Sequence, residues 1–180
     1  MKKYISLLLA VVVIFCLAAC SDPPEGNHNQ ALDNLVAVRY RGESASITKL
    51  APKEYWTWYE SEGRKVSELI TYSSGAYNSW LNVIGGQYGE NLTVTYTITS
   101  EETLDKDTQK RFIQEMERKY GIDADTISGG KTLFVTFTLT GSLKTDTIDS
   151  EFILFTIDGT QYLVRAADDN GNFTVDFQIY

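Results

Sequence analysis

Near its middle the chain reads Leu92-Thr93-Val94-Thr95-Tyr96-Thr97-Ile98-Thr99. Apolar and threonine side chains alternate strictly there, which is typical of a β-strand with one buried face and one face in water. Asp105 follows as a candidate N-cap, and the apolar residues from there to Tyr120 repeat at helical spacing. Gly121 suits the left-handed turn that ends such a helix. The sequence therefore predicts a strand followed directly by an amphipathic helix.

Further strands are expected after this helix. Residues 132–140 again alternate apolar residues with threonine, and residues 147–157 form a longer run with apolar residues on both faces near its end. Asp158-Gly159 is a strong signal for a tight hairpin. A second turn is expected at residues 169–172, before a last strand over residues 173–179. Short turns of this kind join antiparallel strands.

The segment before residue 92 predicts helices. We expect one over residues 31–41, a short one over 44–50, and another over 52–63, where a proline fits the first turn. A longer helix is expected from Arg64 until Gly85-Gly86, because its apolar residues recur at spacings of three, four and seven. The predicted fold class is α+β: N-terminal helices packed on a curved, mainly antiparallel sheet, as a cone, in the order helices, strand, helix, strands.

The first twenty residues have the order of an export signal. Lys2 and Lys3 precede an apolar run over residues 5–19, which ends in Leu17-Ala18-Ala19-Cys20. A basic end, a short apolar helix and small residues before the cleavage site define a signal peptide. Leucine, two small residues and cysteine are also similar to the lipobox of bacterial lipoproteins. The alternatives are an ordinary signal peptide with a chance cysteine, or an anchor that is not cleaved.

This organisation predicts three parts. Residues 1–19 are a lipoprotein signal peptide, residues 20–30 are the lipidated Cys20 and a flexible tether, and residues 31–180 are a single α+β domain. We expect the protein at the cell membrane, lipid-anchored on its extracytoplasmic face. The membrane, through the lipid on Cys20, is the first expected partner.

Composition excludes several classes of function. The formal net charge of −8 becomes −10 once Lys2 and Lys3 leave with the signal, and so acidic a surface repels nucleic acid. Cys16 and Cys20 lie outside the predicted domain, and the one histidine, His28, lies in the predicted tether. Disulfides, thiolate metal sites and serine–histidine–aspartate triads therefore lack their usual residues. We expect no cofactor and no metal.

Three motifs carry a family resemblance. They are Leu50-Ala51-Pro52-Lys53-Glu54-Tyr55, the strand at residues 92–99 with its helix ending Lys119-Tyr120-Gly121-Ile122, and Ile157-Asp158-Gly159-Thr160-Gln161-Tyr162-Leu163-Val164. Together they resemble the nuclear-transport-factor-two-like, or cystatin-like, small lipoproteins of Gram-positive gut bacteria, over roughly residues 31–165. The resemblance implies a cone whose sheet and helices enclose a pocket. Relatives include isomerases, dehydratases and proteins without known activity, and no catalytic residue of theirs matches a position here.

A cluster of aromatic residues is the main candidate for a binding site. Trp56, Trp58 and Trp80 fall within 25 residues, together with Tyr55, Tyr59, Tyr72 and Tyr77. The candidate ligand-binding residues among them are Trp56, Trp58, Tyr59, Tyr77 and Trp80. Flat rings with a polar tip suit stacking on sugars and other amphipathic ligands. The alternative is that several of these rings fill the space between the helices and the sheet.

Shorter motifs favour ordinary interpretations. Asp149 and Glu151 lie two residues apart on one predicted strand, as an acid–base pair or, more simply, a solvated acidic face. Residues 168–172 fit a hairpin better than a calcium loop, because the glycine and glutamate that such a loop needs are missing. Ser46-Ile47-Thr48-Lys49 fits the Ser-x-x-Lys pattern of penicillin-interacting enzymes, without the other elements of that site.

Three functions remain open. The first is a lipid-anchored binding or protein-interaction module of the cell envelope, whose partner is a saccharide, a peptide or a protein. The alternative is an isomerase or hydro-lyase-type enzyme that uses a buried Asp or Tyr in the cone pocket. The third is an accessory subunit that meets a partner through its sheet edge or threonine-rich face. A buried carboxyl in a closed pocket favours the enzyme, whereas a filled cone with exposed Trp56 or Trp58 favours binding.

Overall fold

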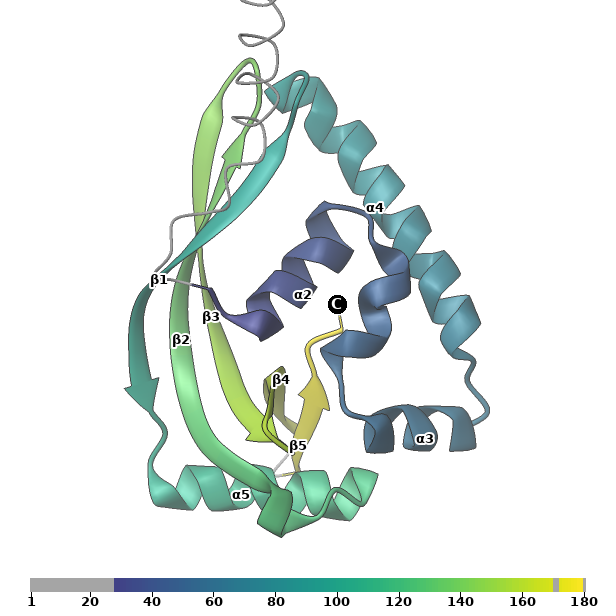
Figure 1. Ribbon diagram of the computed structural model, residues 1–180, viewed down its shortest axis with the longest axis vertical. Helices are drawn as coiled ribbons and strands as arrows, with labels where there is room; N and C mark the ends of the chain where they lie inside the picture. Colours follow the sequence, from purple (N-terminus) through teal and green to yellow (C-terminus); the bar gives the residue numbers. More distant parts are fainter. Residues whose placement is uncertain (1–27, 170–171, 180) are drawn as a thin grey trace, which may run out of the picture.

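The computed structural model describes residues 28–169 and 172–179, which form an α+β fold (Figure 1). The described elements are α2 (Gln30–Tyr40), the 3₁₀ segment η1 (Ser44–Leu50), α3 (Lys53–Ser61), α4 (Val66–Tyr88), β1 (Thr93–Thr103), α5 (Lys106–Tyr120), the 3₁₀ turn η2 (Ala124–Thr126), β2 (Ile127–Thr140), β3 (Thr145–Ile157), β4 (Thr160–Asp169) and β5 (Asn172–Phe177). The predicted signal peptide, Cys20 and most of the predicted tether lie outside the described residues, as do residues 170–171 of the second predicted turn.

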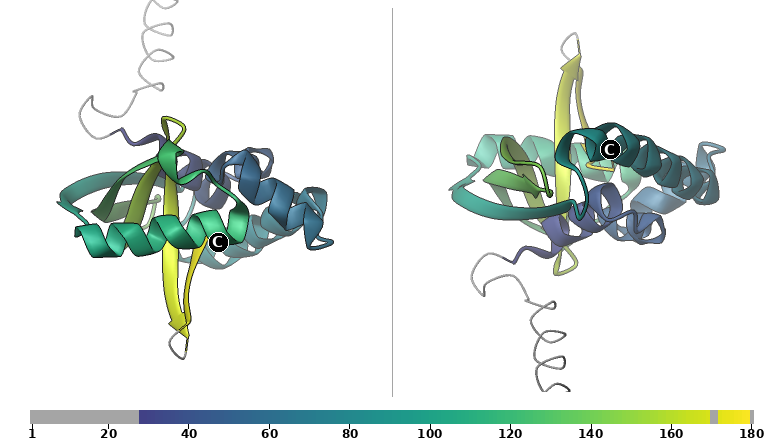
Figure 2. Two further views of the ribbon diagram at one scale, coloured as in Figure 1. Left: turned by 90° about the horizontal axis from the view of Figure 1, so that it is seen from below. Right: turned by 90° about the horizontal axis from the view of Figure 1, so that it is seen from above.

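The five strands form one antiparallel sheet in the order β1-β2-β3-β4-β5, which confirms the predicted fold class. The long strands β1, β2 and β3 curve, and α2 lies in the concave side of the sheet (Figure 1). The register shifts between Ile98 and Ser100 on β1 and between Ser128 and Lys131 on β2. Irregularities of this kind bend a strand and increase its twist. Figure 2 shows β4 and β5 projecting away from the plane of the other strands.

Several local predictions are confirmed. The Asp105 carboxylate accepts hydrogen bonds from the backbone N–H groups of Asp107 (3.0 Å) and Thr108 (2.9 Å) at the start of α5. Gly121 ends this helix at φ 68°, in the left-handed region. Asp158 and Gly159 join β3 to β4 with φ 48° and 74°, as a two-residue hairpin turn of the primed type requires.

The predicted end of α4 at Gly85-Gly86 is wrong, because the helix continues to Tyr88. Glycine in a helix costs only about 1 kcal/mol, so tertiary contacts can carry a helix through it. Here the turn between β2 and β3 holds the last helical turn, since the backbone N–H of Leu143 donates to the Tyr88 carbonyl at 2.8 Å. Gly89, at φ 80°, then supplies the positive angle that ends the helix.

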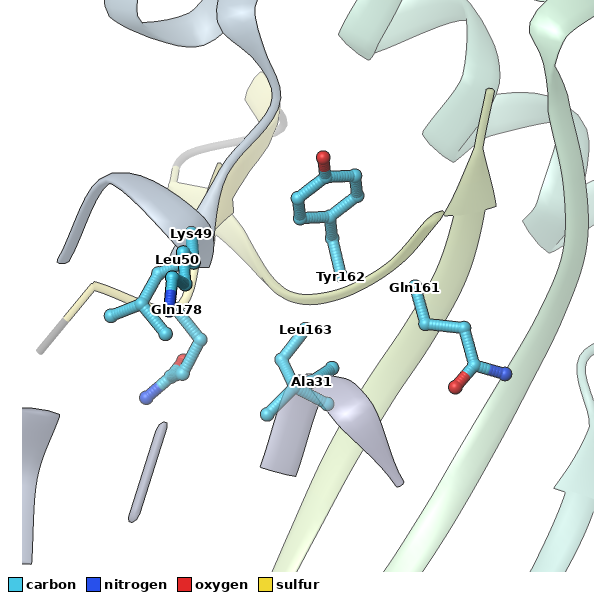
Figure 3. Close-up of a pocket in the computed structure, with 7 residues that line it drawn as sticks. All are labelled: Ala31, Lys49, Leu50, Gln161, Tyr162, Leu163 and Gln178. Carbon is cyan, nitrogen blue, oxygen red and sulfur yellow. The ribbon is translucent and has the colours of Figure 1, made fainter. Parts of the chain in front are cut away.

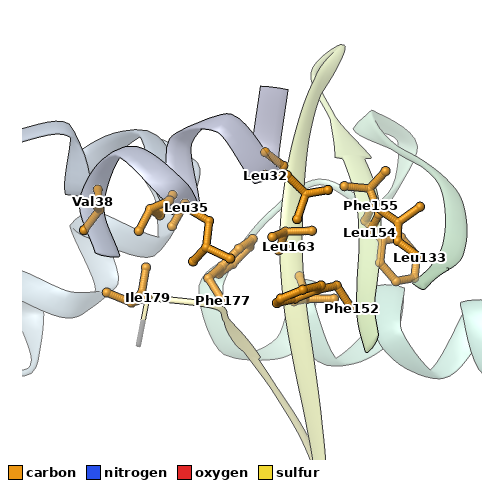
Figure 4. Close-up of a cluster of buried hydrophobic side chains, with 14 of the residues drawn as sticks. Leu32, Leu35, Val38, Leu133, Phe152, Leu154, Phe155, Leu163, Phe177 and Ile179 are labelled. Carbon is orange, nitrogen blue, oxygen red and sulfur yellow. The ribbon is translucent and has the colours of Figure 1, made fainter. Parts of the chain in front are cut away.

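The hydrophobic core lies between α2, α5 and the concave face of the sheet (Figure 4). Helix α2 contributes Leu32 and Leu35, both fully buried. Phe155 of β3 is also fully buried and packs on Phe112 of α5, with ring centroids 5.2 Å apart. Side chains therefore fill the inside of the cone between α2, α5 and the sheet.

Asn29, which precedes α2, is tied to the sheet. The Asn29 side-chain oxygen accepts hydrogen bonds from the backbone N–H groups of Ala31 (3.1 Å) and Leu32 (3.2 Å), so it caps α2. Its amide group donates to the Gln161 side chain on β4 at 2.9 Å. The Asn29 backbone N–H donates to the Tyr96 hydroxyl on β1, also at 2.9 Å. The start of the domain is thus tied to two strands.

Replacing Asn29 by alanine should lower the free energy of unfolding by about 1–2 kcal/mol, because the cap is lost and the partly buried Gln161 amide loses its partner. Asn29→Ser keeps a capping oxygen but cannot reach Gln161, so its loss should be smaller. Denaturant unfolding followed by circular dichroism measures both. Equal losses for the two variants would contradict the capping role.

Candidate binding surface on helix α3

The five predicted aromatic site residues fall into two separate groups. Trp56, Trp58 and Tyr59 lie on α3. Trp80 of α4 instead packs on Tyr40 of α2, with ring centroids 5.3 Å apart, and lies 6.0 Å from Tyr77. Tyr40 in turn contacts Phe137 of the sheet at 5.8 Å. The α4 group therefore joins α4 to the core, and the two groups do not form one platform.

Within the α3 group, Trp56 and Tyr55 hold the helix in place. The Trp56 indole N–H lies within hydrogen-bond distance of the carbonyls of Thr48 (2.9 Å) and Ala51 (3.0 Å), which ties α3 to η1. The ring of Tyr55 is buried and lies 5.3 Å from the ring of Phe177 on β5. These two side chains mainly position their neighbours.

Trp58 and Tyr59 are half-buried, and cationic side chains lie close to their rings. The Arg64 guanidinium carbon lies 5.8 Å from the Trp58 ring centroid and 5.4 Å from that of Tyr59. The Lys119 ammonium of α5 lies 5.1 Å from the Trp58 ring. Cations within about 6 Å of an aromatic face are attracted to it. The outer part of α3 is thus an aromatic surface bordered by positive charge.

An open cleft of about 680 Å³ separates α3 and the first half of α4 from β4 and β5. We call it the α3 cleft. Its buried floor consists of Tyr55, Leu69, Phe177 and Ile179. Its sides and rim consist of Tyr59, Arg64, Glu68, Tyr72, Arg165 and Asp176. This volume lies within the range of about 300–1,000 Å³ that is usual for small-molecule sites.

A smaller hollow of about 380 Å³ lies on the other side of Trp58. It is lined by Lys53, Glu54, Thr57, Trp58, Ser61, Lys119 and Tyr120. Because Arg64 approaches Trp58 from the side of the α3 cleft, the two hollows border the same short helix. Helix α3 therefore offers concave surfaces on both flanks.

The interior hollow between α2, η1 and β4 differs from these clefts. It is lined by Ala31, Lys49, Leu50, Gln161, Tyr162, Leu163 and Gln178 (Figure 3). It leaves no room even for a water molecule. This part of the cone therefore offers no space for a substrate.

The buried ionisable groups of the cone are engaged by the fold. Glu115, the most buried carboxylate with a described side chain, receives two hydrogen bonds of 2.7 Å from Arg118. The Tyr120 hydroxyl lies 2.9 Å from the Val175 carbonyl and 3.1 Å from Asp176 Oδ1. Burial raises the pKa of Tyr120 well above its usual range, and Asp176 adds to this effect. These groups act as hydrogen-bonding partners within the structure.

Tyr96 should titrate late in the folded protein. Burial raises its pKa to about 12; the Asn29 backbone opposes this shift, and the hydrogen bond to Asp33 Oδ1 adds to it. This pKa lies above the ordinary tyrosine value near 10, so the folded state favours the protonated hydroxyl of Tyr96. The contribution of this hydroxyl to the free energy of unfolding is therefore complete below about pH 10 and is lost as the pH rises towards 12. Tyrosinate absorbance should show a late phase that is smaller by one tyrosine in Tyr96→Phe, because Tyr120, whose pKa is also raised, still titrates late in that variant. An unchanged titration curve in that variant would contradict this assignment.

Asp149 and Glu151 lie exposed on β3, beside a shallow hollow of the outer sheet face. Asp149 accepts a hydrogen bond from the Thr136 hydroxyl at 2.7 Å. Among the side chains that the structure describes, no group of three or more His, Cys, Asp and Glu has the arrangement of a metal site. Within residues 28–169 and 172–179, no helix is both long and apolar enough to cross a bilayer.

Comparisons of the chain with protein-family models, curated proteins and solved structures find no match. The assignment of the candidate site therefore rests on the geometry of the described residues. Sequence reasoning did not find Arg64, Arg165 and Asp176, which come from three different segments. Only Arg64 had a signal in the sequence, because it follows the aromatic helix closely.

Proposed function

We propose that this protein is a lipid-anchored binding module on the extracytoplasmic face of the cell membrane, and that the α3 cleft is its ligand site. The observation that carries this proposal is the combination of an apolar floor, the half-buried ring of Tyr59 and the Arg64 guanidinium in one open concave surface. Ligand sites typically combine apolar and aromatic walls with a few polar groups that fix orientation. Tyrosine and tryptophan are also enriched where binding energy is concentrated.

The anchoring part of the proposal rests on the sequence. Lys2 and Lys3, the apolar run and the Leu17-Ala18-Ala19-Cys20 motif support export and lipidation of Cys20. We also propose a distant relation to the nuclear-transport-factor-two-like lipoproteins, which the observed order of helices, strand, helix and strands supports. The envelope partners open to such a protein are a saccharide, a peptide or another protein.

Binding accounts for the geometry better than isomerase or hydro-lyase chemistry does. A general base must have room for a substrate next to it. The hydroxyls of Tyr96 and Tyr120 are hydrogen-bonded within the fold, and the interior hollow beside Tyr162 admits no water molecule. Two open hollows instead border α3, where the aromatic and cationic side chains lie.

A ligand screen tests the proposed site. The full-length lipoprotein in nanodiscs of neutral lipid is titrated with envelope saccharides and peptides, and tryptophan emission and calorimetry report binding. For any ligand that binds, Tyr59→Ala should weaken affinity roughly tenfold or more, as expected for a central aromatic contact. Tyr77→Leu, in the separate aromatic group, is the control and should leave affinity unchanged. Silence across the panel, or sensitivity to Tyr77→Leu alone, would refute the α3 cleft as the ligand site.

A further inference from the structure

The charged side chains of the α3 cleft differ in whether they form an ion pair. Glu68 pairs with Lys65 at 3.1 Å, and Asp176 pairs with Arg165 at 3.7 Å, so both carboxylates of the cleft have a cationic partner. Arg64, in contrast, has no carboxylate within 4.0 Å among the described side chains. Its guanidinium lies over the rings of Trp58 and Tyr59. This leaves its N–H donors without an anionic partner at the rim of the cleft.

Arg39 adds to the positive potential behind this rim. It is half-buried in the last turn of α2, near Arg165, and has no carboxylate partner within ion-pair distance in the described part of the chain. Burial lowers the pKa of Arg39; Tyr40 opposes this shift, and the nearby Arg165 adds to it. Arginine nevertheless stays protonated in proteins. A local excess of guanidinium charge thus exists in a chain whose formal net charge is −8.

The rest of the cleft provides surfaces for a ring-shaped ligand with C–H groups on its faces. Tyr59 lies half-buried at one side, and Tyr72 is 65% exposed at another. Aromatic rings with a polar tip present an apolar face and a hydrogen-bonding end to the same ligand. The planar groups of Arg165 and Asp176 lie beside them and suit hydrogen bonds to hydroxyl groups. An apolar stacking face together with planar polar groups matches a sugar ring.

An extended peptide fits this site less well. Peptides that bind beside a strand add to its free edge through main-chain hydrogen bonds. On β5, the strand that borders the cleft, the Val175 carbonyl is already engaged by the Tyr120 hydroxyl at 2.9 Å and by the Lys119 ammonium at 3.1 Å. Side chains rather than a free strand edge therefore dominate the recognition surface.

We propose that the α3 cleft binds a sugar residue that carries a carboxylate, with Arg64 receiving the carboxylate and Tyr59 and Tyr72 contacting the ring. This inference rests on the proposed function and names the ligand class of the same site. The planar guanidinium fork matches a carboxylate in a two-bond arrangement. The open mouth of the cleft also accommodates a sugar within a longer polymer.

A matched pair of oligosaccharides tests the proposal. An oligogalacturonide and its neutral galactose counterpart, which lacks the carboxylates, are titrated by calorimetry against the full-length protein in nanodiscs of neutral lipid. The acidic oligomer should bind roughly tenfold or more tightly than the neutral one, as expected for a charge-assisted hydrogen bond. Arg64→Gln should remove this preference, while Lys106→Gln, the same charge change on α5, should retain it. Added salt should weaken only the acidic oligomer.

Each other outcome has a defined meaning. Equal affinity for the two oligomers, unchanged in Arg64→Gln, would overturn the acidic-sugar assignment and leave binding at the cleft intact. A polyglutamate peptide could instead bind as tightly as the acidic oligosaccharide, with an affinity that Tyr59→Ala leaves unchanged. That result would overturn the proposal in favour of anion binding without ring contacts. Absence of binding by both oligomers would also overturn it, and the broader screen would still decide the proposed function. Because Arg64 is exposed, Arg64→Gln should fold normally, which circular dichroism verifies.

Discussion

Phe155→Ala is expected to lower the free energy of unfolding by about 3–5 kcal/mol, the usual effect of removing a fully buried phenylalanine ring. Phe155 is a fully buried member of the core (Figure 4) and packs on Phe112, with ring centroids 5.2 Å apart. Gly130, at the irregularity of β2, has no side chain and so lets the Phe155 ring approach. The loss would be a large part of the 5–15 kcal/mol that stabilises a typical domain.

Ile148→Ala is the matched control, because Ile148 lies on the same strand but is 49% exposed. Its effect should stay within about 0.5 kcal/mol, as for most surface positions. Urea unfolding of each variant, followed by circular dichroism, measures the difference. A loss of less than about 1 kcal/mol for Phe155→Ala would mean that α5 and the sheet are not packed as described.

Cys20→Ser should move most of the protein from the membrane fraction to the soluble fraction. Cys20 ends the predicted lipobox, and serine has no thiol to accept the lipid. Stable anchoring requires two acyl-type chains or an equivalent second signal, so the unmodified protein should not be retained. Fractionation with immunoblotting measures the change.

Cys16→Ser is the control for this experiment, because Cys16 lies within the predicted signal peptide and should leave localisation unchanged. Mass spectrometry of the native protein provides an independent test, since it should find a lipid-modified cysteine as the first residue. Retention of Cys20→Ser in membranes, or an intact Met1 with an unmodified thiol at position 20, would refute lipid anchoring.

Local signals in the sequence were sufficient for much of the fold. The threonine alternation at residues 92–99 predicted β1, and Asp105 with Gly121 predicted both ends of α5. The prediction for Gly85-Gly86 was wrong because the stop of α4 depends on residues far along the chain. The turn that contacts Tyr88 lies more than fifty residues later, and no local pattern contains that information.

The candidate site was predictable only in part. The concentration of aromatic residues pointed to α3, yet the sequence could not show that Trp80 faces Tyr40 while Tyr59 borders a cleft. The rim residue Arg165 comes from a strand a hundred residues away from α3. Its position depends on the register of β4 with β5, in which Arg165 lies opposite Asp176.

The hydrogen bonds of Asn29 to Tyr96 and Gln161 have a consequence for the proposed lipid anchoring. They fix the place where the polypeptide leaves the domain, beside β1, whereas α3 lies on the side of α2 away from β1 (Figure 1). The nine residue steps from Cys20 to Asn29 span at most about 32 Å when fully extended. If Cys20 is lipidated, this length limits how far from the bilayer the α3 cleft can lie.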